Sequence, residues 1–287
     1  MSPTNLPSRV KNDTMTDRHV SRRGRALRYV QGKFMPTLYH YPALGSRMRL
    51  PRRVGYGKIP AMAGETVKTT GIVIAVRPWS RTSHVVTWLT PDHGPVPTLV
   101  KGAVRPKSAF LGQYDLFYRC ELLYYAHSSG GIHAIRDAVP LDLREHLRGD
   151  WRATALAGYA ADLAGELAPP DSDSAAWFEF LDRYLARPRP LVSLETGILR
   201  LAGLFPDLSG VDPSAPWTLF AIDRGRCGDG QRTVRLSPRT AAVLAAPDSS
   251  SITPEERKDA ERFLGVFMAY HLERPAEIRR SLVQMLA

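Results

Sequence analysis

The apolar residues between positions 66 and 138 occur in short runs that turn-forming residues separate. Residues 71–76 are apolar at nearly every position, which predicts a buried strand. The same reasoning predicts four more strands, at residues 84–89, 96–100, 115–125 and 132–138. Five short strands with a long link between the third and the fourth match the small Greek-key barrel called an OB-fold, although periodicity alone does not separate it from another small barrel.

After Pro140 the apolar residues adopt helical spacing. Residues 151–167 and 174–185 predict two helices, and residues 194–204 predict a third. Thr253 followed by Pro254 is a strong helix start, because threonine caps the first turn and proline fits its first position. That helix is expected to run to about residue 272, and a short last helix carries Ile278, Leu282 and Leu286.

The segment between residues 216 and 238 follows neither period and predicts a loop or short hairpin inserted between helices. Trp217, Leu219 and Phe220 are expected to anchor it by packing. The whole pattern predicts an α+β fold in two domains, with an OB-fold barrel over residues 65–140 and an all-helical C-terminal domain over residues 141–287.

The net charge of +11 is confined to the first fifth of the chain. Residues 1–60 contain 13 Lys/Arg and 2 Asp/Glu, while the remaining residues contain 26 of each sign. Residues 1–64 also lack a sustained apolar period, so we expect a basic, disordered extension. It either adds nonspecific affinity for phosphate groups or is a solvated tail, so the excess charge alone does not identify a nucleic-acid-binding protein.

Two cysteines far apart in sequence, Cys120 and Cys227, give no disulfide framework and fit a reducing compartment. No apolar stretch is long enough to span a bilayer, and the N-terminus lacks the apolar core of a signal peptide. We therefore expect a cytoplasmic protein with no membrane partner.

The chain carries few candidate catalytic groups. It has no G-x-S-x-G elbow, no phosphate-binding P-loop and no H-E-x-x-H helix. Ser83, His84 and Asp92 are close in sequence and could form a nucleophile with its base, but a surface strand residue is the simpler reading of His84. His127 and His133 are two ligands at most, too few to hold zinc. We expect no catalytic residue, no cofactor and no metal.

Cations and aromatic residues alternate within the predicted barrel. A groove for single-stranded nucleic acid needs both, because cations follow the phosphates and flat side chains stack on bases. Trp79 stands in a predicted loop between two arginines and is the best candidate for an exposed stacking residue. The candidate DNA-binding residues are Lys68, Arg77, Trp79, Arg81, Lys101, Arg105 and Lys107.

These residues lie in a motif that resembles the N-terminal domain of RecO recombination mediators. The motif consists of Gly71-Ile72-Val73, then Arg77-Pro78-x-Ser80-x-x-Ser83-x-x-Val86-Thr87, and then Lys101-Gly102-x-x-Arg105-x-Lys107-Ser108. The resemblance extends over about residues 66–285 and is most specific between Gly71 and Ser108.

The resemblance implies an OB-fold that binds single- and double-stranded DNA and promotes strand annealing. It also implies binding of the acidic C-terminal tail of the single-stranded-DNA-binding protein SSB, help with RecA loading together with RecR, and association with the nucleoid. By motif position the DNA contacts include Arg77, Lys101, Arg105 and Lys107, with Arg81 and Lys68 added. An adaptor whose barrel binds a protein and not DNA is the alternative, because one fold hosts many functions.

The chain departs from the family pattern near residues 216–238. Many family members carry a four-cysteine zinc site there, and this sequence retains only Cys227. One thiolate cannot form a tetrahedral site, so we expect a degenerate, zinc-finger-like insertion without metal.

Overall fold

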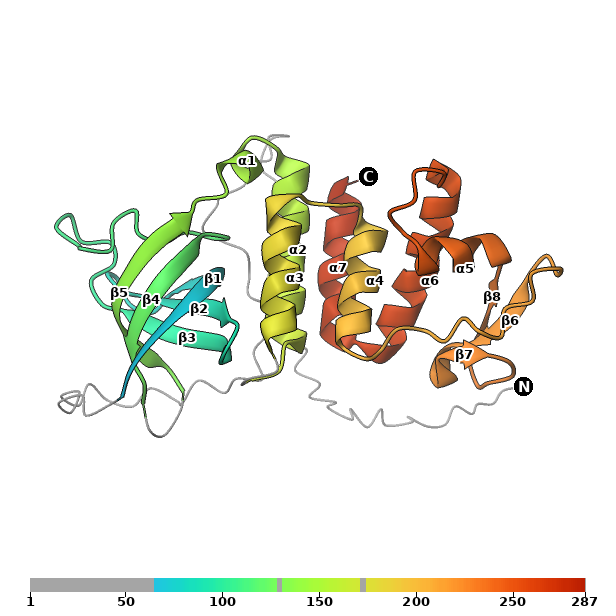
Figure 1. Cartoon of the computed structure of the whole chain (residues 1–287), viewed down its shortest axis with the longest axis horizontal. Helices are drawn as coiled ribbons and strands as arrows, with labels where there is room; N and C mark the ends of the chain where they lie inside the picture. Colours follow the sequence, from blue (N-terminus) through green and yellow to red (C-terminus); the bar gives the residue numbers. More distant parts are fainter. Residues whose placement is uncertain (1–64, 128–130, 171–173, 287) are drawn as a thin grey trace, which may run out of the picture. The chain divides into compact units, whose positions relative to one another are not determined.

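The computed structural model describes residues 65–127, 131–170 and 174–286 (Figure 1). The predicted extension over residues 1–64 lies outside them. Five strands form a closed barrel in the order β1-β2-β3-β5-β4. They are β1 (Thr66–Pro78), β2 (His84–Thr90), β3 (Gly94–Val100), β4 (Arg119–Tyr125) and β5 (His133–Asp142).

The long strand β1 belongs to both halves of the barrel. Its first part, up to Ile72, pairs with β4. Its second part, from Ile72 on, pairs with β2, with a register shift between Val73 and Ala75. A short parallel pairing of Thr98 and Leu99 with β5 closes the barrel on the other side. All other neighbouring strands in the barrel are antiparallel.

The apolar run in β1 is buried on both faces of the strand, which explains why it lacks alternation. Val73 points into the barrel and packs in a cluster with Trp88 and Leu122. Ile72 and Ile74 belong to the other cluster, which the helices share. A strand that is covered on both sides needs apolar residues at every position.

The helices following the barrel are α1 (Glu145–Arg148), α2 (Trp151–Leu167), α3 (Ala175–Ala186), α4 (Leu191–Leu201), α5 (Pro238–Ala245), α6 (Pro254–His271) and α7 (Glu273–Leu286). The α+β prediction is therefore confirmed. Helix α6 begins as predicted, because Thr253 and Glu256 form a reciprocal capping box. The third predicted helix begins earlier, at Leu191, with Pro190 as its N-cap.

The prediction of an all-helical C-terminal domain is wrong. Strands β6 (Thr218–Ala221), β7 (Arg226–Cys227) and β8 (Thr233–Leu236) form an antiparallel sheet in the order β7-β6-β8, with a 3-10 turn, η2 (Ile222–Arg224), after β6. These strands have four residues or fewer, too short to show a period in the sequence. The sheet occupies the predicted insertion.

Only one of the three predicted anchors holds this sheet. Phe220 is fully buried and packs edge-on against Phe263 and Phe267 of α6. The side chain of His271 adds a hydrogen bond to the carbonyl oxygen of Ile222 at 2.8 Å. Trp217 and Leu219 were expected to be packed but are 40% and 38% exposed.

A buried ion pair joins α7 to the helical core. The guanidinium of Arg279 donates to both carboxylate oxygens of Glu195 in α4, at 2.6 and 3.1 Å. Glu195 is fully buried, and Tyr159 of α2 donates a third hydrogen bond to it at 3.0 Å. Burial raises the pKa of the Glu195 carboxyl, whereas the charge of Arg279 opposes that shift.

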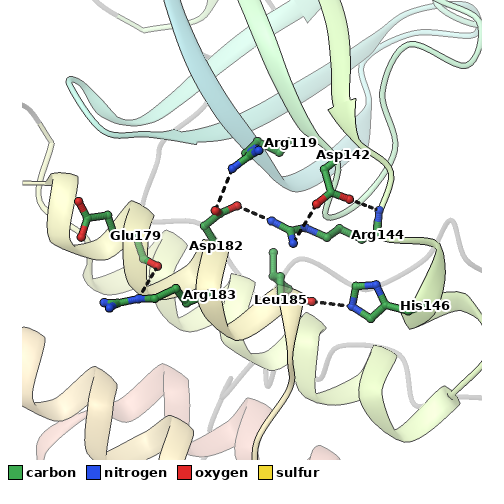
Figure 2. A network of polar contacts seen from close by, with 8 residues as sticks. All are labelled: Arg119, Asp142, Arg144, His146, Glu179, Asp182, Arg183 and Leu185. Carbon is green, nitrogen blue, oxygen red and sulfur yellow. Dashed lines mark hydrogen bonds and ion pairs between the residues drawn. The ribbon is translucent and has the colours of Figure 1, made fainter.

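Polar contacts connect the barrel to α3 at two places. The backbone N–H of Gly94, the first residue of β3, donates to the hydroxyl of Ser174 at 2.8 Å. Figure 2 shows the second contact, where Asp182 accepts hydrogen bonds from Arg119 of β4, at 3.0 Å, and from Arg144 after β5. Asp142 also pairs with Arg144, whose side chain is buried.

Candidate nucleic-acid interface

Two loops meet at one end of the barrel. Residues 79–83 connect β1 to β2, where the N–H of Trp79 bonds to the carbonyl of Ser83 at 2.8 Å. The segment after β3 joins this turn through two hydrogen bonds, from Val104 N–H to the Thr82 carbonyl at 3.3 Å and from Gly102 N–H to the Ser83 hydroxyl at 3.2 Å. Residues separated by about 20 positions in sequence therefore lie side by side.

This junction gathers most of the predicted DNA-binding residues. We call it the basic end of the barrel and define it by Arg77, Trp79, Arg81, Lys101, Arg105 and Lys107. Arg77 lies at the end of β1 and Lys101 directly follows β3. Strand pairing brings these two strand ends together, because His84 of β2 pairs with both Pro78 and Val100.

Gly102 shapes the second loop. Its φ of +66° is a left-handed conformation that other residues rarely adopt. A Cβ at this position would lie 3.1 Å from Cδ of Arg105, so the arginine side chain passes directly over the glycine. The N–H of Arg105 bonds to the carbonyl of Gly102 at 3.0 Å and closes the turn. The turn therefore holds Arg105 beside Lys101.

The five cations of the basic end are exposed, and none forms an ion pair among the residues that the structure describes. Between residues 77 and 114 the only acidic residue is Asp92. Asp92 bonds to Thr69 at 3.0 Å, at the opposite end of β2. The basic end thus has a local positive charge that nearby carboxylates do not neutralise.

Exposed apolar side chains accompany these cations. Trp79 is 48% exposed, as predicted for a stacking residue. Val104 and Leu111 in the second loop are also about half exposed, at 49% and 51%. The sequence pattern did not single out these two, because isolated apolar residues in a loop can point inward or outward. Cations beside exposed apolar groups suit a ligand with phosphates and flat bases.

Lys68 lies elsewhere, although the sequence pattern grouped it with the others. It precedes Arg77 by nine positions in β1, or about 30 Å of strand path at roughly 3.3 Å per residue. It also pairs with Glu121 of the neighbouring strand at 3.0 Å. This cross-strand partner neutralises its charge, and strand pairing between distant segments could not be read from the sequence.

Ser83, His84 and Asp92 do not come together as a catalytic group. Ser83 is buried and accepts the Gly102 hydrogen bond. His84 contacts the hydroxyl of Tyr114 through Nδ1 at 2.9 Å, and burial lowers its pKa. Asp92 lies at the other end of the strand. His84 and Tyr114 therefore support the base of the loops.

The described part of the chain places no group of three His, Cys, Asp or Glu side chains where it could hold a metal ion. Cys227 is partly buried, and burial followed by the charge of Asp207 raises the pKa of its thiol. His127 and His133 bond to each other, from the backbone N–H of the first to Nδ1 of the second at 3.0 Å. None of the described helices is long and apolar enough to cross a membrane.

Comparison with known proteins covers both parts of the chain. The family described as "Recombination protein O N terminal" matches residues 62–144, and "Recombination protein O C terminal" matches residues 148–280. A protein named DNA repair protein RecO from Anaeromyxobacter sp. (strain K) is 30% identical over 244 residues, covering 76% of this chain and 96% of that protein. Proteins of the same name from Geobacter metallireducens and Myxococcus xanthus are each 27% identical, over 77% and 71% of this chain and 98% and 91% of their own lengths. The chain therefore belongs to the RecO family.

Proposed function

We propose that this protein is a recombination mediator in DNA repair and that the basic end of its barrel binds single-stranded DNA. The observation that carries the proposal is the meeting of five exposed, unpaired cations with an exposed Trp79 where two hydrogen-bonded loops leave the barrel strands. The cations of such a surface can contact the phosphates of a flexible single strand, and a base can stack on the indole ring of Trp79. The role needs no catalytic residue.

The strand order supports the assignment of the barrel as an OB-fold. The order β1-β2-β3-β5-β4, with β3 and β5 parallel, is the connectivity of a five-stranded Greek-key barrel. Loops of such barrels commonly bind oligonucleotides, which fits the position of the basic end on the β1–β2 loop and the segment after β3. Its phosphate contacts would also give weaker affinity for double-stranded DNA.

The proposed protein partners are the SSB tail and RecR, with which the protein would help RecA load on SSB-coated DNA and promote annealing. The helical half offers a pocket of about 380 Å³ lined by Phe180, Arg183, Arg187 and Arg189. Its three guanidinium groups and one phenyl ring suit an acidic tail that also carries apolar residues. Arg189 already pairs with Asp248 at 2.5 Å, so Arg183 and Arg187 would supply most of the charge.

Fluorescence anisotropy with a labelled single-stranded oligonucleotide tests the DNA-binding proposal. If all five cations contact phosphates, affinity should fall about 100-fold between roughly 50 and 200 mM salt, because binding releases counterions. The double variant Arg105→Glu/Lys107→Glu should bind at least about tenfold more weakly and with a shallower salt dependence. Trp79→Ala should lose roughly 1–3 kcal/mol of binding free energy.

Lys68→Gln is the matched control, since Lys68 is an exposed lysine of the same barrel that pairs with Glu121. Its affinity should stay close to that of the wild type. Equal losses in the Lys68 variant and the double variant would refute the site. A wild-type protein that binds an SSB tail peptide but ignores oligonucleotides at low salt would favour the adaptor function instead.

A further inference from the structure

The small sheet in the helical half has one face buried and one face exposed. Phe220 points inward to the α6 aromatics, so its neighbour Leu219 points outward. Arg235 pairs directly with Leu219 across the β6–β8 ladder and is exposed on the same face. Trp217, just before β6, completes this surface. We call it the outer sheet face.

Trp217 and Arg235 form a stacked pair on the outer sheet face. The guanidinium carbon of Arg235 lies 4.5 Å from the centroid of the Trp217 ring. When a guanidinium stacks on a ring, its N–H groups still point outward in the plane of the guanidinium and can donate to phosphate oxygens. Trp217 and Leu219 nevertheless remain 40% and 38% exposed, which a purely structural pair would not require.

The sheet carries further positive charge. Residues 218–236 contain four arginines and two aspartates, and all four arginines are exposed. None of the four forms an ion pair within the described residues. One of the two acids, Asp223, is engaged in the turn before β8, where it accepts the backbone N–H groups of Gln231 and Arg232 at 3.2 Å each.

Packing on the buried side of the sheet holds the outer sheet face in place. Phe220 is fully buried, and His271 of α6 fixes the carbonyl of Ile222. Gly210 lies so close to Cys227 that a Cβ there would be 2.9 Å from the cysteine Cβ. The exposed ring and guanidinium groups therefore stand on a packed support, which limits the ordering cost of binding.

We propose that the outer sheet face is a second binding surface for single-stranded nucleic acid, separate from the basic end of the barrel. Arg235 on this face and the three other exposed arginines of the sheet segment match a phosphate backbone in charge, and Trp217 and Leu219 offer apolar contact to bases. The inference rests on the proposed function, in which the basic end binds one strand. Two such surfaces on one chain hold two strands at high effective concentration, which accelerates their annealing.

Photo-crosslinking of the full chain to an oligonucleotide that contains 5-iododeoxyuridine locates the contacts, with the attached peptides mapped by mass spectrometry. We expect crosslinks in a peptide that contains Trp217 and, independently, in a peptide that contains Trp79. A short oligothymidylate should bind with a stoichiometry of two per chain. In the variant Trp217→Ala/Arg235→Ala the stoichiometry should fall to one, and the annealing rate of two complementary strands should fall about tenfold.

Two further variants separate binding from folding. Trp217→Phe retains a ring and should restore most of the annealing rate. Arg262→Ala removes an exposed arginine of α6 that pairs with Asp259 and should leave both stoichiometry and rate unchanged. Because Trp217 and Arg235 are exposed, the double variant should melt within a few degrees of the wild type.

The outcomes distinguish this inference from the proposed function. Crosslinks confined to barrel peptides, with one oligonucleotide per chain, overturn the second surface and leave the basic end intact. A chain that binds polyglutamate through Trp217 and Arg235 but gives no crosslink there also overturns it. If the wild-type protein binds no oligonucleotide at low salt, both the proposed function and the second binding surface are refuted.

Discussion

Removing Arg279 should destabilise the helical half strongly, because it leaves a charge in the core without its partner. Arg279 supplies two hydrogen bonds to the fully buried Glu195 and one to the carbonyl of Glu261 at 2.7 Å. Breaking a buried ion pair by deleting one member costs about 3–5 kcal/mol. Arg279→Met should therefore lower the free energy of unfolding by that amount.

Urea denaturation followed by circular dichroism measures this loss. With a slope of about 2–3 kcal/mol per molar, the midpoint should shift down by about 1–2.5 M. The neighbouring Arg280 is exposed and provides the matched control. Arg280→Met should change stability by less than about 0.5 kcal/mol, as surface substitutions usually do.

A double variant tests the cause of the loss. Glu195→Gln/Arg279→Met removes both charges and keeps an acceptor for the hydroxyl of Tyr159. If the unpaired carboxylate is the source of the cost, the double variant should regain at least half of the lost stability. A loss below about 1 kcal/mol in Arg279→Met alone would show that Glu195 tolerates burial without its partner and would refute the reasoning.

Two other predictions concern the barrel. Gly94→Ala should cost about 2–4 kcal/mol, since Gly94 has a φ of +62° and a Cβ there would lie 2.2 Å from the carbonyl oxygen of Pro169. Gly112→Ala, at a φ of +73° with open space around it, should cost only about 1 kcal/mol in the same urea titration, and equal costs would contradict the contact. Burial lowers the pKa of His84 in the folded state, so the unfolded chain takes up the proton first as the pH falls. The contribution of neutral His84 to the free energy of unfolding is therefore complete above the unfolded pKa of 6.5 and is lost as the pH falls below that value. The urea midpoint of the wild type should therefore drop between about pH 7.5 and 5.5 by more than that of His84→Gln, and identical drops would exclude His84 as a cause.

The sequence predicted elements whose signals are local. The apolar run of β1 and the capping box of α6 are each contained in a few consecutive residues, and both elements occur where the pattern placed them. The sheet β7-β6-β8 was predicted only as a loop or short hairpin, because its strands are too short for a period. Strand β5 continues to Asp142, four residues beyond the strand end predicted at residue 138, because Pro140 and Asp142 pair with Cys120 and Arg119 in the ladder.

The sequence could predict those parts of the candidate site that lie on neighbouring loops of the barrel. Arg77 and Lys101 lie at the same end of the barrel because β1 and β3 both pair antiparallel with β2, an arrangement that the strand pattern implies. The neutralisation of Lys68 by Glu121 was not predictable, because it depends on the pairing of β1 with β4, which are distant in sequence. The exposure of Trp217 was missed for a similar reason, since which face of a short strand meets the core is decided by tertiary packing.

The double burial of β1 has a consequence for how the chain can be divided. Ile72, Ile74, Leu89 and Phe117 come from the barrel segment but pack within the cluster of the helices. A fragment ending near residue 143 would present these four side chains to water, and we expect it to self-associate or to unfold readily. The two family models match separate segments of the chain, residues 62–144 and 148–280. Because the two segments share a hydrophobic core, we expect them to unfold cooperatively as one unit.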